Sequence, residues 1–95
     1  MTSNERAQLR RAANGMRAIF QIGKESMTDQ LVTGIDQALA VRELVKVAVL
    51  PAALMNTRVT ADAFAKLLKA EVVQVIGSRF ILYRRNPELN RYGIE

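Results

Sequence analysis

Residues 18–28 read Ala-Ile-Phe-Gln-Ile-Gly-Lys-Glu-Ser-Met-Thr, and this stretch decides how the chain folds. Residues 18–22 are rich in bulky apolar side chains with little polar alternation, which predicts a strand buried on both faces. The run breaks at Gly23. Thr28 has the side chain of an N-cap, and Asp29 would then lie in the first helical turn. The stretch therefore predicts a strand, a short turn and the start of a helix.

The predicted turn has the properties of an anion site. Backbone N–H groups at the start of a helix lie at the positive end of the helix dipole, and Lys24 stands beside them. Such a turn suits a phosphate group. Taken alone, however, a turn of this kind is more often an ordinary strand-to-helix connection with a solvated lysine.

The residues before this stretch predict a first helix. Thr2 and Glu5 have the spacing of a capping box, and apolar residues then recur at helical spacing as far as Met16. Gly15 is predicted to end the helix. Three basic residues share the side away from the apolar ones and predict a basic stripe: Arg6, Arg10 and Arg17.

The residues after the stretch continue the alternation of helices and strands. The helix that follows Thr28 is predicted to run to about residue 42, with Gly34 permitting a close packing contact. Residues 44–50 form a second strand that has valines on one face and Lys46 on the other, and Pro51 closes it. A strand, a helix and a strand predict a parallel pair joined by a right-handed crossover. The Gly23 turn would then lie at the carboxyl end of a strand, where open α/β sheets bind ligands.

The last part of the chain predicts a helix followed by a hairpin. Asn56 is expected to cap a third helix, whose apolar face carries Val59, Ala63, Phe64, Leu67 and Leu68. Residues 72–76 and 79–84 form two strands around a two-residue turn. We expect a domain of residues 1–86 and a mobile tail of residues 87–95. The order α-β-α-β-α-β-β predicts one α/β domain with a four-stranded mixed sheet covered by helices.

The composition excludes most catalytic sites. The 95 residues include no Cys and no His, so disulfides, thiolates, the usual zinc ligands and the commonest general base are all missing. A small nuclease that uses Glu25, Asp29 or Glu43 with a metal ion is the remaining enzymatic alternative. Because no carboxylates cluster at ligand spacing, we expect no enzymatic activity, no cofactor, no metal and no small-molecule substrate.

The hydropathy pattern argues against a membrane protein. The longest uncharged apolar run, residues 47–55, is interrupted by Pro51 and is far shorter than the roughly 20 residues that span a bilayer. The first 11 residues are polar and lack the apolar core of a signal peptide. We therefore expect a cytoplasmic protein with no membrane partner, acting as a monomer.

The net charge of +5 is unevenly distributed along the chain. Residues 1–24 carry a net charge of +4, residues 25–77 carry −1 and residues 78–95 carry +2. If the fold brings the two ends together, they form one basic face suited to a polyanion. A solvated surface that keeps the protein soluble is one alternative, and a module that docks an acidic protein partner is another.

Three segments together resemble the CRM (chloroplast RNA splicing and ribosome maturation) domain family, in particular its bacterial single-domain YhbY-type members. Residues 9–28, LRRAANGMRAIFQIGKESMT, resemble the family's helix and strand leading into a G-K-x-G-L-T turn. Residues 43–47, ELVKV, resemble its E-L-(V/I)-K-V strand. Residues 72–84, VVQVIGSRFILYR, resemble its closing hairpin. The three segments occur in the family's order over about residues 5–86.

The resemblance implies an RNA-binding domain with an architecture similar to the C-terminal domain of translation initiation factor three. It also implies ribosomal RNA, in precursors of the large subunit, as the partner. The family's turn usually reads G-x-x-G, whereas here Ser26 replaces the second glycine, with a hydroxyl that is able to donate to a phosphate or cap the following helix. A second departure lies at Asn14, Gly15 and Ala18, where relatives often carry His and Pro.

The RNA site that follows has the Gly23 turn at its centre. The N–H groups of the turn and Lys24 would hold phosphates, and the arginines of the first helix would extend the track. Tyr83 is expected to pack within its strand rather than stack on a base. The predicted contacts are Gly23, Lys24, Glu25, Ser26, Met27, Thr28, Arg6, Arg10, Arg17, Arg42, Lys46, Arg79, Arg84 and Arg85.

Overall fold

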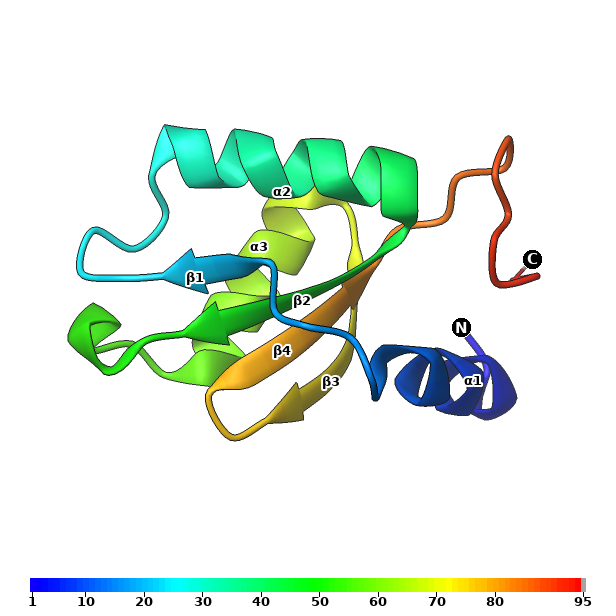
Figure 1. Cartoon of the computed structure of the whole chain (residues 1–95), viewed down its shortest axis with the longest axis horizontal. Coiled ribbons are helices and arrows are strands. Elements are labelled where there is room, and N and C mark those ends of the chain that lie inside the picture. Colours follow the sequence, from blue (N-terminus) through cyan, green and yellow to red (C-terminus); the bar gives the residue numbers. More distant parts are fainter. Residues whose placement is uncertain (95) are drawn as a thin grey trace.

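The computed structural model of the chain describes residues 1–94, and helices and strands alternate along it (Figure 1). The elements are α1 (Ser3–Ala13), β1 (Phe20–Ile22), α2 (Asp29–Arg42), β2 (Leu44–Val49), the 3-10 helix η1 (Pro51–Ala53), α3 (Thr57–Leu68), β3 (Glu71–Ile76) and β4 (Arg79–Tyr83). This order confirms the predicted α/β domain. None of the described helices has the length and apolar character needed to cross a membrane.

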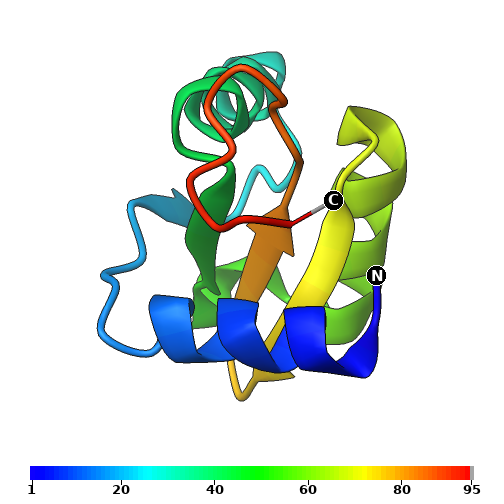
Figure 2. The same ribbon diagram turned by 90° about the vertical axis from the view of Figure 1, so that its right-hand side faces the viewer.

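The four strands form one mixed sheet in the order β1-β2-β4-β3. β1 runs parallel to β2, and β4 lies antiparallel to both β2 and β3. The predicted parallel pair and the predicted hairpin are therefore both confirmed. α2 and α3 cover one face of the sheet, while α1 crosses the other face near one end (Figures 1 and 2).

Apolar side chains form a cluster on each face of the sheet. The larger cluster lies between the sheet and α2 and α3, where the Phe64 and Phe80 ring centroids are 6.3 Å apart. The smaller cluster joins Leu9 and Ala13 of α1 to strand residues that include Tyr83, only 4% exposed. Burial raises the pKa of the Tyr83 phenol, and the Glu43 carboxylate adds to the rise. Tyr83 packs within the sheet, as the sequence predicted.

The local signals at the helix ends are confirmed. The side chains of Thr2, Thr28 and Asn56 each accept a hydrogen bond from a backbone N–H in the first turn of the helix that follows. Gly34 permits the close contact that was expected of it. A Cβ atom at this position would lie 3.0 Å from Cε1 of the Phe20 ring, so the glycine lets β1 approach α2 closely.

Two predictions about the first part of the chain were wrong. β1 is the edge strand of the sheet, and Gln21 is exposed, so this strand is not buried on both faces. α1 ends at Ala13, so Arg17 lies in the connection to β1 rather than on the helix. The basic stripe predicted from Arg6, Arg10 and Arg17 therefore does not exist as one helical face.

The buried face of α3 is rotated from the predicted one. Val59 and Leu67 are 60% and 56% exposed, whereas Thr60, Ala61 and Ala65 are buried. Burial of Thr60 is possible because its hydroxyl donates to the Asn56 carbonyl at 2.9 Å. Phe64 and Leu68 lie in the core as predicted.

The chain that follows β4 packs back onto the domain through a buried carboxylate. Glu43 is fully buried, and its two oxygens accept the backbone N–H groups of Asn86 at 2.8 Å and Arg91 at 2.7 Å. Ile94 is buried beside α1, and the Gln8 amide donates to the Tyr92 carbonyl at 2.6 Å. Glu95, the last residue of the predicted mobile tail, lies outside the described residues. Mobility of the tail stays a prediction, and Glu43 is the residue through which it is tested.

We expect Glu43→Gln to lower the free energy of unfolding and to release residues 86–94. An amide has one acceptor oxygen in place of two, so one of the two N–H groups loses its acceptor, at a cost of about 1–3 kcal/mol. Hydrogen exchange by NMR should show faster exchange at Asn86 and Arg91. Glu88→Gln makes the same chemical change at an exposed site and should alter neither quantity. Fast exchange of residues 86–94 in the unsubstituted protein, unchanged by Glu43→Gln, would contradict this account and support a mobile tail.

Candidate functional site

Residues 23–28, here called the 23–28 loop, join the edge strand β1 to α2 and project from one end of the molecule (Figure 1). The Ser26 N–H donates to the Gly23 carbonyl, and the Thr28 N–H donates to the Ser26 carbonyl, both at 3.0 Å. Within residues 1–94, the backbone N–H groups of Lys24, Glu25 and Met27 have no protein acceptor. The loop therefore presents uncommitted donors beside the positive end of the α2 dipole, as the sequence predicted.

Ser26 has the backbone conformation that favours glycine. Its φ is +58°, in the left-handed region where a side chain costs about 1 kcal/mol or more. The residue therefore occupies the conformation for which the second glycine of a G-x-x-G turn is suited. Its hydroxyl lies 2.9 Å from the Met55 sulfur, while Thr28 caps α2. The Ser26 side chain thus ties the loop to the segment after η1 and does not cap the helix.

The loop borders a groove of about 580 Å³ between β1 and α2. The half-buried side chains of Phe20 and Leu31 give the groove an apolar part, and Lys24 supplies a positive charge at its mouth. Glu25 also lines the groove and contributes a negative charge. The lining residues are Phe20, Gln21, Gly23, Lys24, Glu25, Ser26, Thr28, Gln30, Leu31 and Gly34. Met27 lies outside this lining and packs against the core, which anchors the loop.

Gly23 has no structural need to be glycine in this fold. Its φ lies outside the left-handed region, and a Cβ atom built on it would meet nothing within 4 Å. The missing side chain therefore leaves open space on the surface of the groove. Lys24 and Glu25 are exposed beside it, so a ligand has free access to the backbone of the loop.

Three of the predicted basic residues lie together near the loop end of the sheet. Arg17, Lys46 and Arg79 line one hollow on the face of the sheet opposite α2. The Lys46 ammonium group donates to the Met16 carbonyl at 2.9 Å and so fixes the connection that carries Arg17. The structure therefore brings Arg79 close to β1, as the binding prediction required.

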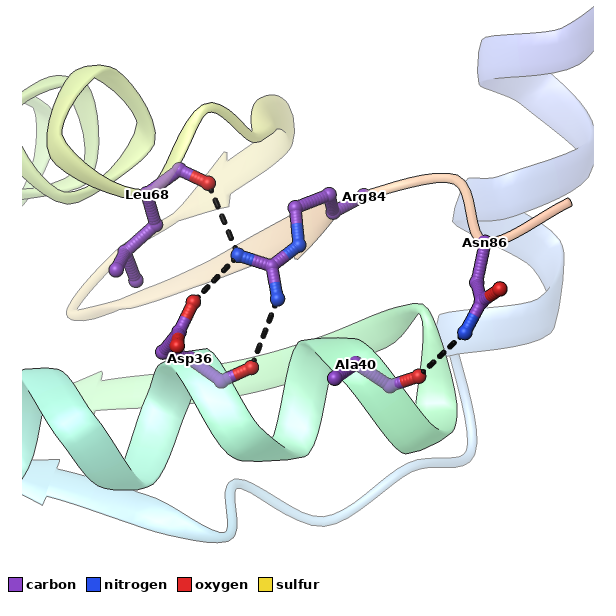
Figure 3. Close-up of polar contacts among 5 residues, drawn as sticks. All are labelled: Asp36, Ala40, Leu68, Arg84 and Asn86. Carbon is purple, nitrogen blue, oxygen red and sulfur yellow. Dashed lines mark hydrogen bonds and ion pairs between the residues drawn. The ribbon is translucent and has the colours of Figure 1, made fainter.

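Other predicted basic residues have structural partners. The Arg84 guanidinium group donates to the Asp36 carboxylate at 2.6 Å, to the Asp36 carbonyl at 2.9 Å and to the Leu68 carbonyl at 3.0 Å, and Figure 3 shows these contacts. Arg85 donates to the Ile94 carbonyl at 2.8 Å. Arg6 donates to the carbonyls of Val72 and Val73, where the pairing of β3 with β4 shifts register. These three arginines satisfy backbone carbonyls that water would otherwise have to solvate.

Distance separates the remaining predicted residues from the loop. Arg42 lies at the far end of α2, which has 14 residues and is therefore about 21 Å long. Arg84 and Arg85 follow β4 at that same far end (Figure 1). Arg10 is exposed on α1, beside Arg11 and the end of β3.

The fold does bring the two chain ends together, but Glu5 and Glu71 also line the hollow there, so no wholly basic face results.

No local sequence pattern points to several residues of the groove. The sequence pattern predicts Gln21 within a buried strand, and it predicts Gln30 and Leu31 only as part of a helix. Their place in the groove depends on the edge position of β1, which no local pattern encodes. Gly34 is an exception, because an isolated glycine within a helical pattern indicates a close approach.

The carboxylates named for the nuclease alternative lie in different places. Glu43 is buried and holds the chain after β4, whereas Glu25 is exposed in the loop and Asp29 begins α2. No group of three or more Asp, Glu, His or Cys side chains within residues 1–94 is placed to hold a metal ion.

The backbone conformation of Ser26 predicts an unusual order of stability. The free energy of unfolding of Ser26→Gly should exceed that of Ser26→Ala by about 1 kcal/mol, because only glycine adopts a positive φ without steric cost. In most positions the order is reversed. Urea denaturation of both variants measures the difference. A less stable glycine variant would show that the loop does not hold residue 26 in the left-handed region.

Comparisons with known proteins show the family to which this chain is related. The model of the CRS1 / YhbY (CRM) domain matches residues 1–84. The "Probable RNA-binding protein YqeI" of Bacillus subtilis (strain 168) is 34% identical over 88 residues, which cover 93% of this chain and 92% of that protein. The "Probable RNA-binding protein MJ0652" of Methanocaldococcus jannaschii is 31% identical over 94 residues, covering 97% of this chain and 69% of that protein.

A solved structure also matches over almost the whole chain. The solution structure of protein SAV1595 from Staphylococcus aureus, described as a candidate RNA-binding protein, superposes with a TM-score of 0.80 at 33% identity. The match covers 97% of this chain and 96% of that one. Family model, sequence relatives and fold agree, and the chain belongs to the CRS1 / YhbY (CRM) domain family.

Proposed function

We propose that this protein binds RNA through the 23–28 loop and the groove beside it. The observation that carries the proposal is that the N–H groups of Lys24, Glu25 and Met27 have no acceptor among the described residues and lie next to an exposed lysine and the start of α2. Phosphates are the anions that such donors suit. The names of the relatives support RNA as the source of those phosphates.

The groove explains how a nucleotide, rather than a bare phosphate, would be held. One side of the groove offers backbone donors and the Lys24 ammonium group to the phosphate. The floor offers the half-buried Phe20 ring and the Leu31 side chain, which suit the flat, partly apolar surface of a base. The open space at Gly23 lets the sugar-phosphate backbone come close to the protein backbone.

The RNA target that we propose is ribosomal RNA in precursors of the large ribosomal subunit, with a role in subunit assembly. The resemblance to the bacterial YhbY-type members supports this target. Of the predicted basic residues, Arg84 is ion-paired with Asp36, whereas Lys24, Arg17 and Arg79 are exposed at the loop end of the sheet.

We expect Lys24→Glu to weaken binding of a single-stranded oligouridylate by at least about tenfold, since a charge-assisted hydrogen bond contributes about 1.5 kcal/mol or more. Fluorescence anisotropy measures the affinity. Lys66→Glu, at an exposed site in the last turn of α3, makes the same change in net charge and should have a much smaller effect. If the two substitutions lowered the affinity for RNA equally, Lys24 would contribute only a general attraction between opposite charges, and the loop would not be the binding site.

A second variant of this experiment tests the shape of the site without changing its charge. Gly23→Leu should fold normally, because its backbone conformation tolerates a side chain and the surrounding space is open. The leucine would nevertheless obstruct the groove, so the affinity for RNA should fall.

The salt dependence of binding separates RNA from an acidic protein partner. Each phosphate contact steepens the slope of the logarithm of the binding constant against the logarithm of the salt concentration by about 0.7 to 0.9.

The ribosomal target predicts where the protein is found in a cell extract. The protein should sediment in a gradient with particles that contain precursors of the large subunit, and RNA crosslinked to it should be enriched in large-subunit sequences. The Lys24→Glu variant should remain near the top of the gradient. Sedimentation of the unsubstituted protein away from all ribosomal particles would contradict the assembly role.

A further inference from the structure

The face of the sheet that carries α1 is not covered along its whole length. α1 packs on Leu44, Ile81 and Tyr83, which lie toward one end of this face. Toward the other end lies a hollow of about 430 Å³, here called the basic hollow, lined by Arg17, Gln21, Lys46, Ala48 and Arg79 among others. Among residues 1–94, no carboxylate lines it.

Strand register accounts for the shape of the basic hollow. Gln21 of β1 lies beside Ala48 of β2, and Ala48 lies beside Arg79 of β4. These three side chains form a row across the sheet and point to the same face, because residues in register on neighbouring strands share a face. Ala48 is the small member at the centre of the row, so a dip forms between the longer side chains of Gln21 and Arg79.

The charges of the basic hollow are available to a ligand. Arg17 and Arg79 are exposed, and within residues 1–94 neither side chain makes a hydrogen bond or an ion pair with the protein. Lys46 is half-buried, with one of its three donors used by the Met16 carbonyl. By contrast, Arg6, Arg84 and Arg85 are all engaged by the protein itself.

The basic hollow meets the groove of the 23–28 loop at the edge of the sheet. Gln21 lines both concavities, and β1, on which it lies, is the edge strand. The groove lies on the α2 side of β1, and the basic hollow lies on the α1 side. A ligand that fills both must therefore pass around the outer edge of one strand.

We propose that the basic hollow is a second phosphate-binding subsite and that the ligand is a single-stranded RNA segment that crosses β1 from the groove to the hollow. This proposal rests on the proposed function of the loop. Arg17 and Arg79 contact phosphates of the segment, and Lys46 holds the Met16 connection in place while adding positive charge. Gln21 lies at the crossing point.

The geometry selects single-stranded RNA. An A-form duplex is stiff and presents its phosphates along two continuous ridges, so it is unable to turn around the edge of one strand. A single strand bends at each nucleotide and exposes its bases to the groove. An unpaired loop or end of a larger RNA has the same property.

The test compares two double variants with oligouridylates of increasing length, from about 4 to about 16 nucleotides. Arg17→Gln with Arg79→Gln removes two charges from the basic hollow. Arg58→Gln with Lys66→Gln removes two charges from exposed positions on α3 and is the matched control. Urea denaturation verifies that both double variants fold. Affinities are measured over a range of salt concentrations, with a blunt-ended RNA duplex as a second probe.

For the unsubstituted protein we expect affinity to rise with length until both concavities are filled. The Arg17 and Arg79 double variant should bind the longer probes roughly five- to thirtyfold more weakly than the control does. Its log–log salt slope should be shallower by about 1.4, as expected for two single-strand phosphate contacts. Short probes that fill only the groove should bind both double variants equally, and the duplex should bind more weakly than the long single strand.

Equal binding of the long probes by the two double variants would overturn the subsite. If Lys24→Glu still weakened binding in that case, the loop function would stand without the basic hollow. If Lys24→Glu also had no effect, the proposed function itself would fall. Tighter binding of the duplex than of the single strand would overturn the path around β1.

Discussion

The parallel pairing of β1 with β2 is the constraint on which the candidate site depends. In this pairing Gln21 lies beside Ala48, and the next pairing places Ala48 beside Arg79. Because β1 is an edge strand, the 23–28 loop at its carboxyl end is exposed on the outside of the sheet. The chain then returns through α2, and Gly34 lets that helix lie close against Phe20. One register therefore fixes the loop, the groove and the basic hollow.

Six of the 14 basic residues illustrate two different situations in the structure. Arg6, Arg84 and Arg85 donate to backbone carbonyls, and Arg84 also pairs with Asp36, so these residues join elements that are distant in sequence. An arginine in this role is a structural cross-link, since its planar group carries several donors. Lys24, Arg17 and Arg79 are exposed at the loop end of the sheet. Arg6, Arg84 and Arg85 are therefore held in place by the protein, and fewer basic side chains are free to turn toward a polyanion than the composition suggests.

Local signals in the sequence predicted the elements well. The capping side chains of Thr2, Thr28 and Asn56 and the turn at residues 77–78 each depend on neighbours within a few residues, and all four features are present. The prediction of the buried face of α3 was wrong because Thr60 is a polar residue in the sequence. In the structure its hydroxyl donates to the Asn56 carbonyl, which allows the side chain to be buried. The same pattern predicts Leu67 in the core, whereas Leu67 is exposed.

The geometry of the candidate site was predicted less completely, because much of it is made by long-range contacts. The loop itself was found from a glycine, a lysine and a helix start. The edge position of β1 depends on strand order, and a five-residue apolar run carries no information about it. The roles of the arginines depend on partners far along the chain, as in the contact of Arg84 with Asp36. Charge patterns alone do not distinguish such a cross-link from a free cation.

The most direct measurement of the central claim is an NMR titration of the isotopically labelled protein with single-stranded RNA. We expect the largest shifts of backbone amide signals at Lys24, Glu25 and Met27, whose N–H groups lack a protein acceptor within residues 1–94. Smaller shifts should follow at Arg17 and Gln21. Shifts confined to α3, or to the far end of α2 around Arg42, would contradict the account and place the RNA site on another surface.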